Sequence, residues 1–259
     1  MTGSALGRPV VLRGLGYRTG RPVTLRLEPG APNSGIVFNG RRADNCSARV
    51  VGHAVRVGRA GMVEHLLAAC AGLGIRDLAV TVDGPEMPLL DGSSLPYVRA
   101  FARAGLRRAA APEPLVLPGP VLVDAGAGFI AAVPADRPFF SCLAEAPEFG
   151  AAHVGLALTR ARFVRELAGA RTVAPVAERP GTLRARYRLR FALCRRGRFV
   201  APRRSRMPDE FCRHKLLDVI GDLALLGRPL AAEVFARNPG HRLNLAFVRT
   251  LQEAQDDER

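Results

Sequence analysis

Residues 211–222 read Phe-Cys-Arg-His-Lys-Leu-Leu-Asp-Val-Ile-Gly-Asp and combine an apolar helix pattern with a row of polar side chains. His214, Asp218 and Asp222 are spaced i, i+4 and i+8, so on a helix they share one face. Apolar residues fill the positions between them, which predicts a helix over 209–226. A histidine and an aspartate one turn apart can both reach one metal ion, and the alternative is a solvated polar stripe.

A second segment, residues 61–70 (Gly-Met-Val-Glu-His-Leu-Leu-Ala-Ala-Cys), offers two more candidates. Glu64 and His65 stand at the start of an apolar helix predicted over 63–73 and stopped by glycine. A carboxylate that enters a buried helix needs a partner. Two histidines, one aspartate and a water form a catalytic zinc set with one open position. Glu64 would then be the base, and the alternative for His65 is a capped or core histidine.

A third segment, residues 238–244 (Asn-Pro-Gly-His-Arg-Leu-Asn), holds His241 in a Pro-Gly turn before a helix predicted over 243–255. From this segment alone, a surface turn residue is the favoured interpretation. His53 and His153 have no polar cluster around them and are assigned no role.

The remaining hydrophobic pattern predicts an α+β fold made of two similar α+β domains, residues 1–108 and 115–259. In each half, strands precede a helix that begins near a histidine, and a glycine and another strand follow. We expect each domain to be a sheet with a helical layer, and the two layers to face each other. A linker is predicted over 107–114. The other predicted helices cover 95–105 and 160–169, and the predicted strands cover 22–28, 34–38, 78–82, 115–117, 120–124, 128–133, 139–144 and 230–236.

Composition limits the classes of partner. The 259 residues carry a net charge of +15, which indicates an anionic partner such as nucleic acid, phosphate, acidic protein or membrane surface. Lys215 is the only lysine among 38 basic residues. Aromatic residues make up 6% with no tryptophan, which argues against stacking on RNA. We expect no spanning helix and no signal peptide, and we interpret the five scattered cysteines as reduced thiols of a cytosolic protein.

Six segments occur in an order that resembles the UDP-3-O-acyl-N-acetylglucosamine deacetylase family, zinc amidases that commit precursors to lipid A synthesis. The resemblance runs over nearly the whole chain. It is carried by residues 14–20 (Gly-Leu-Gly-Tyr-Arg-Thr-Gly), 63–69 (Val-Glu-His-Leu-Leu-Ala-Ala), 85–93 (Pro-Glu-Met-Pro-Leu-Leu-Asp-Gly-Ser), 170–172 (Ala-Arg-Thr), 214–222 (His-Lys-Leu-Leu-Asp-Val-Ile-Gly-Asp) and 240–241 (Gly-His).

The resemblance implies a role for each of eight residues. The implied metal ligands are His65, His214 and Asp218, with Zn2+ as the metal and Fe2+ as the alternative. The implied catalytic residues are Glu64 as general base, His241 for the oxyanion or leaving amine, Asp222 to orient His241, and Thr172 beside the water and oxyanion. Lys215 matches a lysine near the sugar and phosphates. The resemblance also implies two α+β domains that clasp the active site between their helical layers.

The chain departs from the family pattern in three places. Tyr17 and Arg18 stand where the family usually has leucine and histidine, and Val173 stands where it has phenylalanine. Residues 177–200 lack the family's paired glycines. Within this region, arginines alternate with apolar residues over 184–191, so a strand there would show one cationic and one apolar face. We expect the cationic face, Arg184, Arg186, Arg188 and Arg190, to dock on an anionic membrane or to be a solvated edge.

These observations predict a zinc-dependent deacetylase that acts on a UDP-linked acylated amino sugar. We expect a monomer in the bacterial cytoplasm, with peripheral contact to the anionic inner membrane and no specific nucleic-acid partner. The first alternative is a non-catalytic or regulatory relative that binds an anionic UDP-sugar-like ligand. The second is a nucleic-acid-binding protein, argued from the net charge alone.

Overall fold

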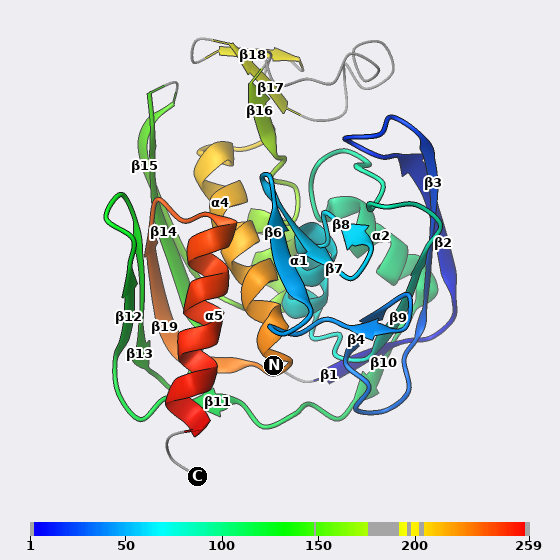
Figure 1. Cartoon of the computed structure of the whole chain (residues 1–259), viewed down its shortest axis with the longest axis horizontal. Coiled ribbons are helices and arrows are strands. Elements are labelled where there is room, and N and C mark those ends of the chain that lie inside the picture. Colours follow the sequence, from blue (N-terminus) through cyan, green and yellow to red (C-terminus); the bar gives the residue numbers. More distant parts are fainter. Residues whose placement is uncertain (1–2, 148, 176–191, 196–197, 202–204, 257–259) are drawn as a thin grey trace.

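The computed structural model describes residues 3–147, 149–175, 192–195, 198–201 and 205–256. It confirms the α+β class, with helices lying between two sheets (Figure 1). The first sheet has the order β2 (Val10–Leu15), β3 (Pro22–Pro29), β9 (Leu78–Val82), β4 (Ile36–Phe38) and β5 (Arg41–Arg42). The second has the order β12 (Val121–Asp124), β13 (Phe129–Pro134), β19 (Leu230–Arg237), β14 (Phe139–Ala146) and β15 (Gly150–Ala157), and β11 (Leu115–Val116) also pairs with β19.

The two halves share one topology. In each sheet the last strand in chain order lies in the centre. Strand β9 is antiparallel to β3 and parallel to β4, and β19 is likewise antiparallel to β13 and parallel to β14. A helix precedes that strand in each half, α1 (Glu64–Leu73) before β9 and α4 (Glu210–Leu223) before β19. Another helix follows it, α2 (Leu95–Ala104) or α5 (His241–Asp256). The predicted similarity of the two halves is therefore confirmed.

Each half also inserts a small three-stranded sheet between its fourth sheet strand and its first long helix. In the N-terminal half it consists of β6 (Ala48–Val51), β7 (Ala54–Val57) and β8 (Ala60–Gly61). In the C-terminal half it consists of β16 (Val173–Pro175), β17 (Ala192–Arg195) and β18 (Arg198–Ala201). The alternating segment 184–191 lies outside the described residues, so its two expected faces stay a prediction.

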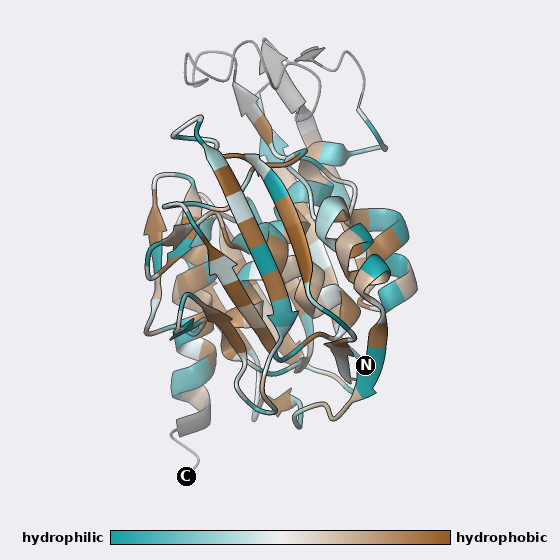
Figure 2. Ribbon diagram, turned by 90° about the vertical axis from the view of Figure 1, so that its right-hand side faces the viewer, coloured by the Kyte–Doolittle hydropathy of each residue, from teal (hydrophilic) through white to brown (hydrophobic). Residues whose placement is uncertain are grey.

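The large sheets form because their strands alternate buried and exposed side chains. In β3, Val23, Leu25 and Leu27 are buried, and the residues between them face outward. Figure 2 views the molecule from the side of β2 and β3 and shows this alternation as bands of brown and teal along the strands. The apolar faces pack on the helices, which places the core between the two sheets.

The helices α1 and α4 pack directly against each other in the centre of the molecule (Figure 1). Gly221 of α4 makes this close approach feasible, because a Cβ atom at that position would collide with the main-chain oxygen of Glu64. Leu66, Leu67 and Leu217 are fully buried in the same layer. The contact therefore brings the first turn of α1 next to the polar face of α4.

Several element boundaries differ from the sequence predictions. The helix predicted over 160–169 is one α-turn, α3 (Arg160–Arg162), followed by a π-helical turn, η1 (Phe163–Leu167). The helix predicted over 209–226 ends as α4 and continues as a 3-10 turn, η4 (Ala224–Leu226). The last helix begins two residues early, at His241. Strand β15 and the short strands β5 to β8 have no counterpart in the prediction.

The predicted linker over 107–114 is wrong at its start. Residues 106–109 form β10 (Leu106–Ala109), which pairs antiparallel with β1 (Gly3–Leu6). Its partner strand lies about a hundred residues away in the sequence, so no local pattern reveals the pairing. No helix among the described residues is long and apolar enough to cross a membrane.

Candidate active site

The three predicted metal ligands lie together where α1 meets α4. His65 is in the first turn of α1, and His214 and Asp218 are one turn apart on α4. Nε2 of His65 lies 3.8 Å from Oδ1 of Asp218, and Nε2 of His214 lies 3.6 Å from Oδ2. One ligand atom from each residue lies within 4.8 Å of the other two. The two imidazoles meet edge to face, with ring centroids 5.0 Å apart.

The chemistry of this set fits a divalent cation. Two atoms that each bind one zinc ion at about 2 Å lie at most about 4 Å apart, and the His65–Asp218 and His214–Asp218 pairs meet this limit. Oδ1 of Asp218 is buried and has no hydrogen-bond partner among the described residues. Burial lowers the pKa of both His65 and His214 to about 4, so both rings are neutral at pH 7. Neutral imidazole is the form that binds a metal.

The ring of His214 is oriented by the loop between η1 and β16. Its Nδ1 lies 3.1 Å from the main-chain oxygen of Ala170. With the proton on Nδ1, this nitrogen donates to the carbonyl and leaves Nε2 free to bind a metal. The hydrogen bond thus fixes both the tautomer and the direction of the ring.

Glu64 is buried directly beside the candidate ligand His65. The main-chain N–H of Val55, in β7, donates to Oε2 of Glu64 at 3.0 Å. Burial raises the pKa of Glu64 to about 8; positive His241 opposes this rise, and Asp218 and Asp222 add to it. A divalent cation on the neighbouring ligands would lower this pKa, because positive charge favours the carboxylate. A carboxyl group that is held in one direction and has a pKa near neutral pH can exchange a proton.

His241 forms a second pair with Asp222. Nδ1 of His241 lies 2.7 Å from Oδ2 of Asp222, which also accepts a hydrogen bond of 2.8 Å from Nδ2 of Asn244. Burial lowers the pKa of His241, but the charge and hydrogen bond of Asp222 outweigh this and raise it to about 10. His241 is therefore a cation at pH 7, able to donate a hydrogen bond or a proton.

Two further predicted residues, Lys215 and Thr172, are each held by a contact to the main chain. Nζ of Lys215 donates to the main-chain oxygen of Pro239 at 3.0 Å and lies 5.9 Å from the ring centroid of Phe211. The main-chain N–H of Thr172 donates to the main-chain oxygen of Gly92 at 2.7 Å. These contacts fix where each residue sits, and their roles toward a substrate stay predictions.

Three residues that hold the site in place were not predicted from the sequence. Asn244 follows His241 by three positions on one helix, so helical spacing could have found it. Ser94 donates from its hydroxyl to the main-chain oxygen of His65 at 2.7 Å, a contact with no local sequence signal. Val55 acts through its main-chain N–H, and nearly every residue type has this group, so the sequence gives no sign of the contact.

A pocket of about 200 Å³ opens beside the segment that leads into α1. Its lining includes Arg18, Arg56, Met62 and Glu86. The buried carboxylate of Glu86 accepts hydrogen bonds from the main-chain N–H groups of Arg18 and Thr19, at 2.8 to 3.2 Å. Glu86 thus fixes the turn that presents Arg18 to the pocket.

Comparison with known proteins gives consistent results. Over residues 4–253 the chain matches the family model described as UDP-3-O-acyl N-acetylglycosamine deacetylase. It is 36% identical to a protein of Myxococcus xanthus over 95% of this chain and 85% of that protein. It is also 36% identical to a protein of Phenylobacterium zucineum, over 96% of this chain and 92% of that protein. A protein of Solibacter usitatus is 34% identical over 94% and 89%.

All three relatives are named UDP-3-O-acyl-N-acetylglucosamine deacetylase. The match covers nearly the whole chain and most of each relative, so both halves of the fold and the residues between them take part. The chain belongs to the UDP-3-O-acyl N-acetylglycosamine deacetylase family.

Proposed function

We propose that this protein is a zinc-dependent deacetylase that removes acetate from UDP-3-O-acyl-N-acetylglucosamine during lipid A biosynthesis. One observation carries the proposal. In a chain of this family, donor atoms of His65, His214 and Asp218 lie within 4.8 Å of one another, beside a buried carboxyl group and a charged histidine. Such a set fits metal-assisted hydrolysis of an amide.

We propose Zn2+ as the metal, with Fe2+ as the alternative. Two imidazoles and one carboxylate are a typical protein ligand set of catalytic zinc, and a fourth position stays open. When bound, the metal would polarise a water molecule and the amide carbonyl.

Glu64 would accept the proton of the attacking water. Its carboxylate is held by the Val55 N–H, so its direction is set before the substrate binds. A general base of this kind contributes about 10²–10⁴ in rate. The departing nitrogen then needs a proton, which Glu64 or His241 can return to it.

His241 would stabilise the carbonyl oxygen as that atom gains negative charge. Asp222 keeps the imidazole charged, with a pKa near 10, and holds it by the 2.7 Å hydrogen bond. Thr172 is proposed as a second donor to the same oxygen. Fixed donors aimed at developing charge are worth about 3–4 kcal/mol each when removed.

Basic side chains around the centre are proposed to bind the anionic part of the substrate. Lys215 is one turn from Asp218 on α4 and is tied to the loop before His241. Arg18 replaces the histidine usual in the family and lines the pocket beside α1. Guanidinium groups bind phosphate oxygens well because their planar N–H groups match the geometry of the anion. We therefore propose that Arg18 and Lys215 contact the diphosphate-sugar portion.

Turnover of the substrate tests this proposal against the regulatory alternative. Purified, zinc-loaded protein is incubated with UDP-3-O-acyl-N-acetylglucosamine, and mass spectrometry follows loss of the acetyl group. The proposed enzyme yields the free amine and acetate. Tight binding of the substrate without any product would support the non-catalytic relative instead.

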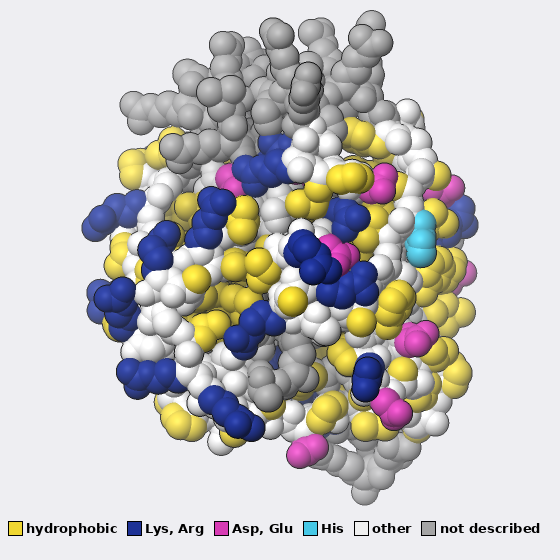
Figure 3. Space-filling model, turned by 180° about the vertical axis from the view of Figure 1, so that it is seen from behind, with side chains coloured by type: hydrophobic (Ala, Val, Ile, Leu, Met, Phe, Trp, Pro, Cys, Tyr) yellow, Lys and Arg dark blue, Asp and Glu magenta, His cyan; other side chains and the backbone are white. Residues whose placement is uncertain are grey.

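We also propose that the protein acts as a monomer in the bacterial cytoplasm, with peripheral contact to an anionic membrane and no specific nucleic-acid partner. The described cysteines Cys46, Cys70, Cys142 and Cys212 are free thiols, which suits a reducing compartment. The net charge of +15 supports membrane contact, and Figure 3 shows arginines spread over one face with fewer acidic side chains. Binding to anionic but not neutral vesicles tests this contact.

A further inference from the structure

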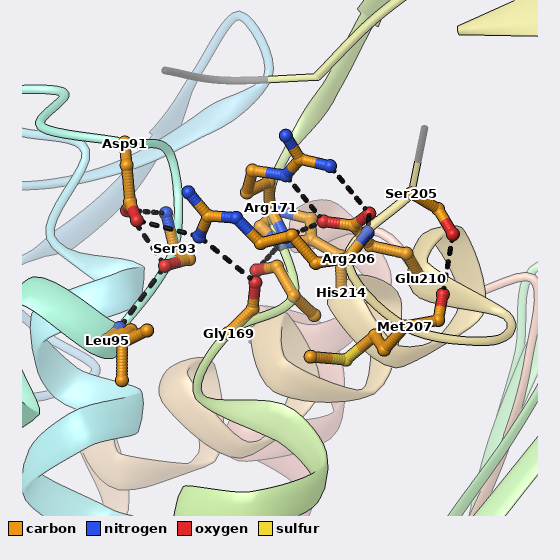
Figure 4. A network of polar contacts seen from close by, with 11 residues as sticks. Asp91, Ser93, Leu95, Gly169, Arg171, Ser205, Arg206, Met207, Glu210 and His214 are labelled. Atoms are coloured by element: carbon orange, nitrogen blue, oxygen red, sulfur yellow. Dashed lines mark hydrogen bonds and ion pairs between the residues drawn. The ribbon is translucent and has the colours of Figure 1, made fainter. Parts of the chain in front are cut away.

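A buried ion pair lies one turn before the ligand His214. The guanidinium of Arg171 donates from Nε to Oε1 of Glu210 at 2.7 Å and from Nη2 to Oε2 at 2.9 Å (Figure 4). Both side chains are about 1% exposed or less. Two parallel N–H···O bonds of this kind fix direction as well as distance. Burial raises the pKa of Glu210, but hydrogen bonds from Arg171 and from the main-chain N–H of Arg206 outweigh this and hold the pKa below its usual value.

Glu210 also accepts hydrogen bonds from two main-chain N–H groups. These belong to Arg171, at 3.0 Å from Oε1, and to Arg206, at 2.7 Å from Oε2. One carboxylate therefore binds the loop at Arg171 and the segment that enters α4. This ion pair differs from a solvated surface pair, because both carboxylate oxygens of Glu210 are buried and each accepts two hydrogen bonds.

The loop that is hydrogen-bonded to Glu210 also orients the ring of His214. The carbonyl of Ala170, which lies 3.1 Å from Nδ1 of His214, belongs to the residue directly before Arg171. Glu210 and His214 are spaced i and i+4 on α4, so both face this loop from the same side of the helix. The helix therefore holds the loop through Glu210, and the loop in turn holds the ring of His214.

A second arm of the network reaches the other histidine. Nη1 of Arg206 donates to Oδ2 of Asp91 at 2.7 Å and to the main-chain oxygen of Gly169 at 3.4 Å (Figure 4). Oδ1 of Asp91 accepts hydrogen bonds from the N–H and hydroxyl of Ser93, at 3.0 and 2.8 Å, and so shapes the turn before α2. From this turn, the Ser94 hydroxyl donates to the main-chain oxygen of His65.

A third contact joins the same turn to the loop. The N–H of Thr172 donates to the main-chain oxygen of Gly92 at 2.7 Å. The turn formed by residues 91–94 therefore touches His65, the Arg206 side chain and the 170–172 loop. The network is continuous from the imidazole of His214 to the main chain of His65, although the two residues belong to different halves of the fold.

We propose that Glu210 is a positioning residue of the metal site. It fixes the ring orientation of His214 through Arg171 and Ala170. It fixes the distance between His214 and His65 through Arg206 and Asp91. Glu210 touches neither metal nor substrate in this proposal. Mutation of a residue that orients a metal-binding histidine commonly lowers metal affinity about 10- to 100-fold. A buried ion pair is weak evidence for stability by itself, since apolar residues can often replace it. In this proposal the ion pair acts by placing His214 and His65 relative to each other.

The test is Glu210→Gln, which keeps the shape of the side chain and removes its charge. We expect zinc to bind about 10- to 100-fold more weakly, measured by competition with a chromophoric chelator. We also expect the visible absorption of the Co2+-substituted protein to change, because that spectrum reports the geometry of the ligands. Glu166→Gln is the matched control. It removes a glutamate paired with Arg162 and Arg165 on the surface, and both readouts should match the wild type.

Folded Glu210→Gln with wild-type zinc affinity and a wild-type cobalt spectrum would overturn the proposal. If this variant does not fold, Arg206→Gln decides the question, because the pair with Asp91 is partly exposed and leaves no buried charge. Zinc affinity at least several-fold lower in Arg206→Gln supports the network, and unchanged affinity with an unchanged spectrum rejects it. The inference rests on the metal site of the proposed function, but both readouts use zinc or cobalt alone. Loss of deacetylation with intact metal binding would therefore contradict only the proposed activity.

Discussion

Nδ1 of His241 lies 2.7 Å from Oδ2 of Asp222, and this contact joins the last helix of the chain to the helix that carries two metal-ligand candidates. Asp222 is completely buried, and Asn244 donates a second hydrogen bond to the same oxygen. The aspartate keeps the histidine charged inside the protein. A charge held in this way has consequences for stability as well as for catalysis.

The stability of the metal-free protein should depend on pH through His241. Its pKa is raised from about 6.5 in the unfolded chain to about 10 in the folded protein. Its contribution to stability is therefore fully present below pH 6.5 and is lost as the pH rises through 10. We expect the free energy of unfolding to fall over this range, and to fall less in His241→Gln. Equal pH slopes in chemical denaturation of the two proteins would contradict the assigned charge.

Replacing Glu64 by glutamine should separate metal binding from turnover. The variant keeps the shape of the side chain and loses the group that accepts the proton. We expect about one zinc per chain, as in the wild type, and a kcat lower by about 10²–10⁴. Zinc is measured by elemental analysis and kcat by acetate release. A zinc-loaded Glu64→Gln protein with nearly normal kcat would place the base elsewhere.

Removing a metal ligand should weaken zinc binding strongly. With three protein ligands, His65→Ala or Asp218→Ala leaves two, and such sites lose most of their affinity. The matched control is His153→Ala, because His153 is exposed and its ring lies 6.4 Å from that of Phe235, on the second sheet. Equilibrium dialysis should show zinc retained in the control and depleted in both ligand variants. Undiminished zinc in both would remove the site assignment.

The contact between α1 and α4 should not tolerate a side chain at position 221. A Cβ atom in Gly221→Ala would collide with the main-chain oxygen of Glu64, so the two helices must separate. Overpacking of this kind typically costs about 1–3 kcal/mol of unfolding free energy. Gly119→Ala is the control, since no atom lies within 4 Å of its added Cβ. Denaturant titration that finds equal stability in the two variants would contradict the role of Gly221.

Much of the fold could be predicted because the central helices and strands carry strong local patterns. The apolar run after His65 and the i, i+4, i+8 spacing from His214 both appear as helices in the structure. The short strands β6 to β8 were missed, since two to four residues show too little alternation to be recognised. Strand β10 was missed because its partner, β1, lies about a hundred residues away in the sequence.

The candidate site divides in the same way. Residue types at helical spacing indicated candidate metal ligands on α4, with a solvated polar stripe as the alternative. The family resemblance supplied the expected roles of His241 and Thr172. The groups that hold them were not predictable locally. The Ala170 carbonyl and the Val55 N–H act through the main chain, which every residue shares. Glu210 and Arg171 are 39 positions apart in the chain and meet only in the folded protein.

Acetate release as a function of added zinc tests the central claim most directly. Protein stripped with a chelator is mixed with UDP-3-O-acyl-N-acetylglucosamine, and zinc is added in small steps. We expect no release from the stripped protein, a rate that rises linearly with zinc, and a plateau at about one zinc per chain. The same titration of His65→Ala should stay near the baseline. Full activity of the stripped protein, or equal activity of His65→Ala at one equivalent of zinc, would contradict the account.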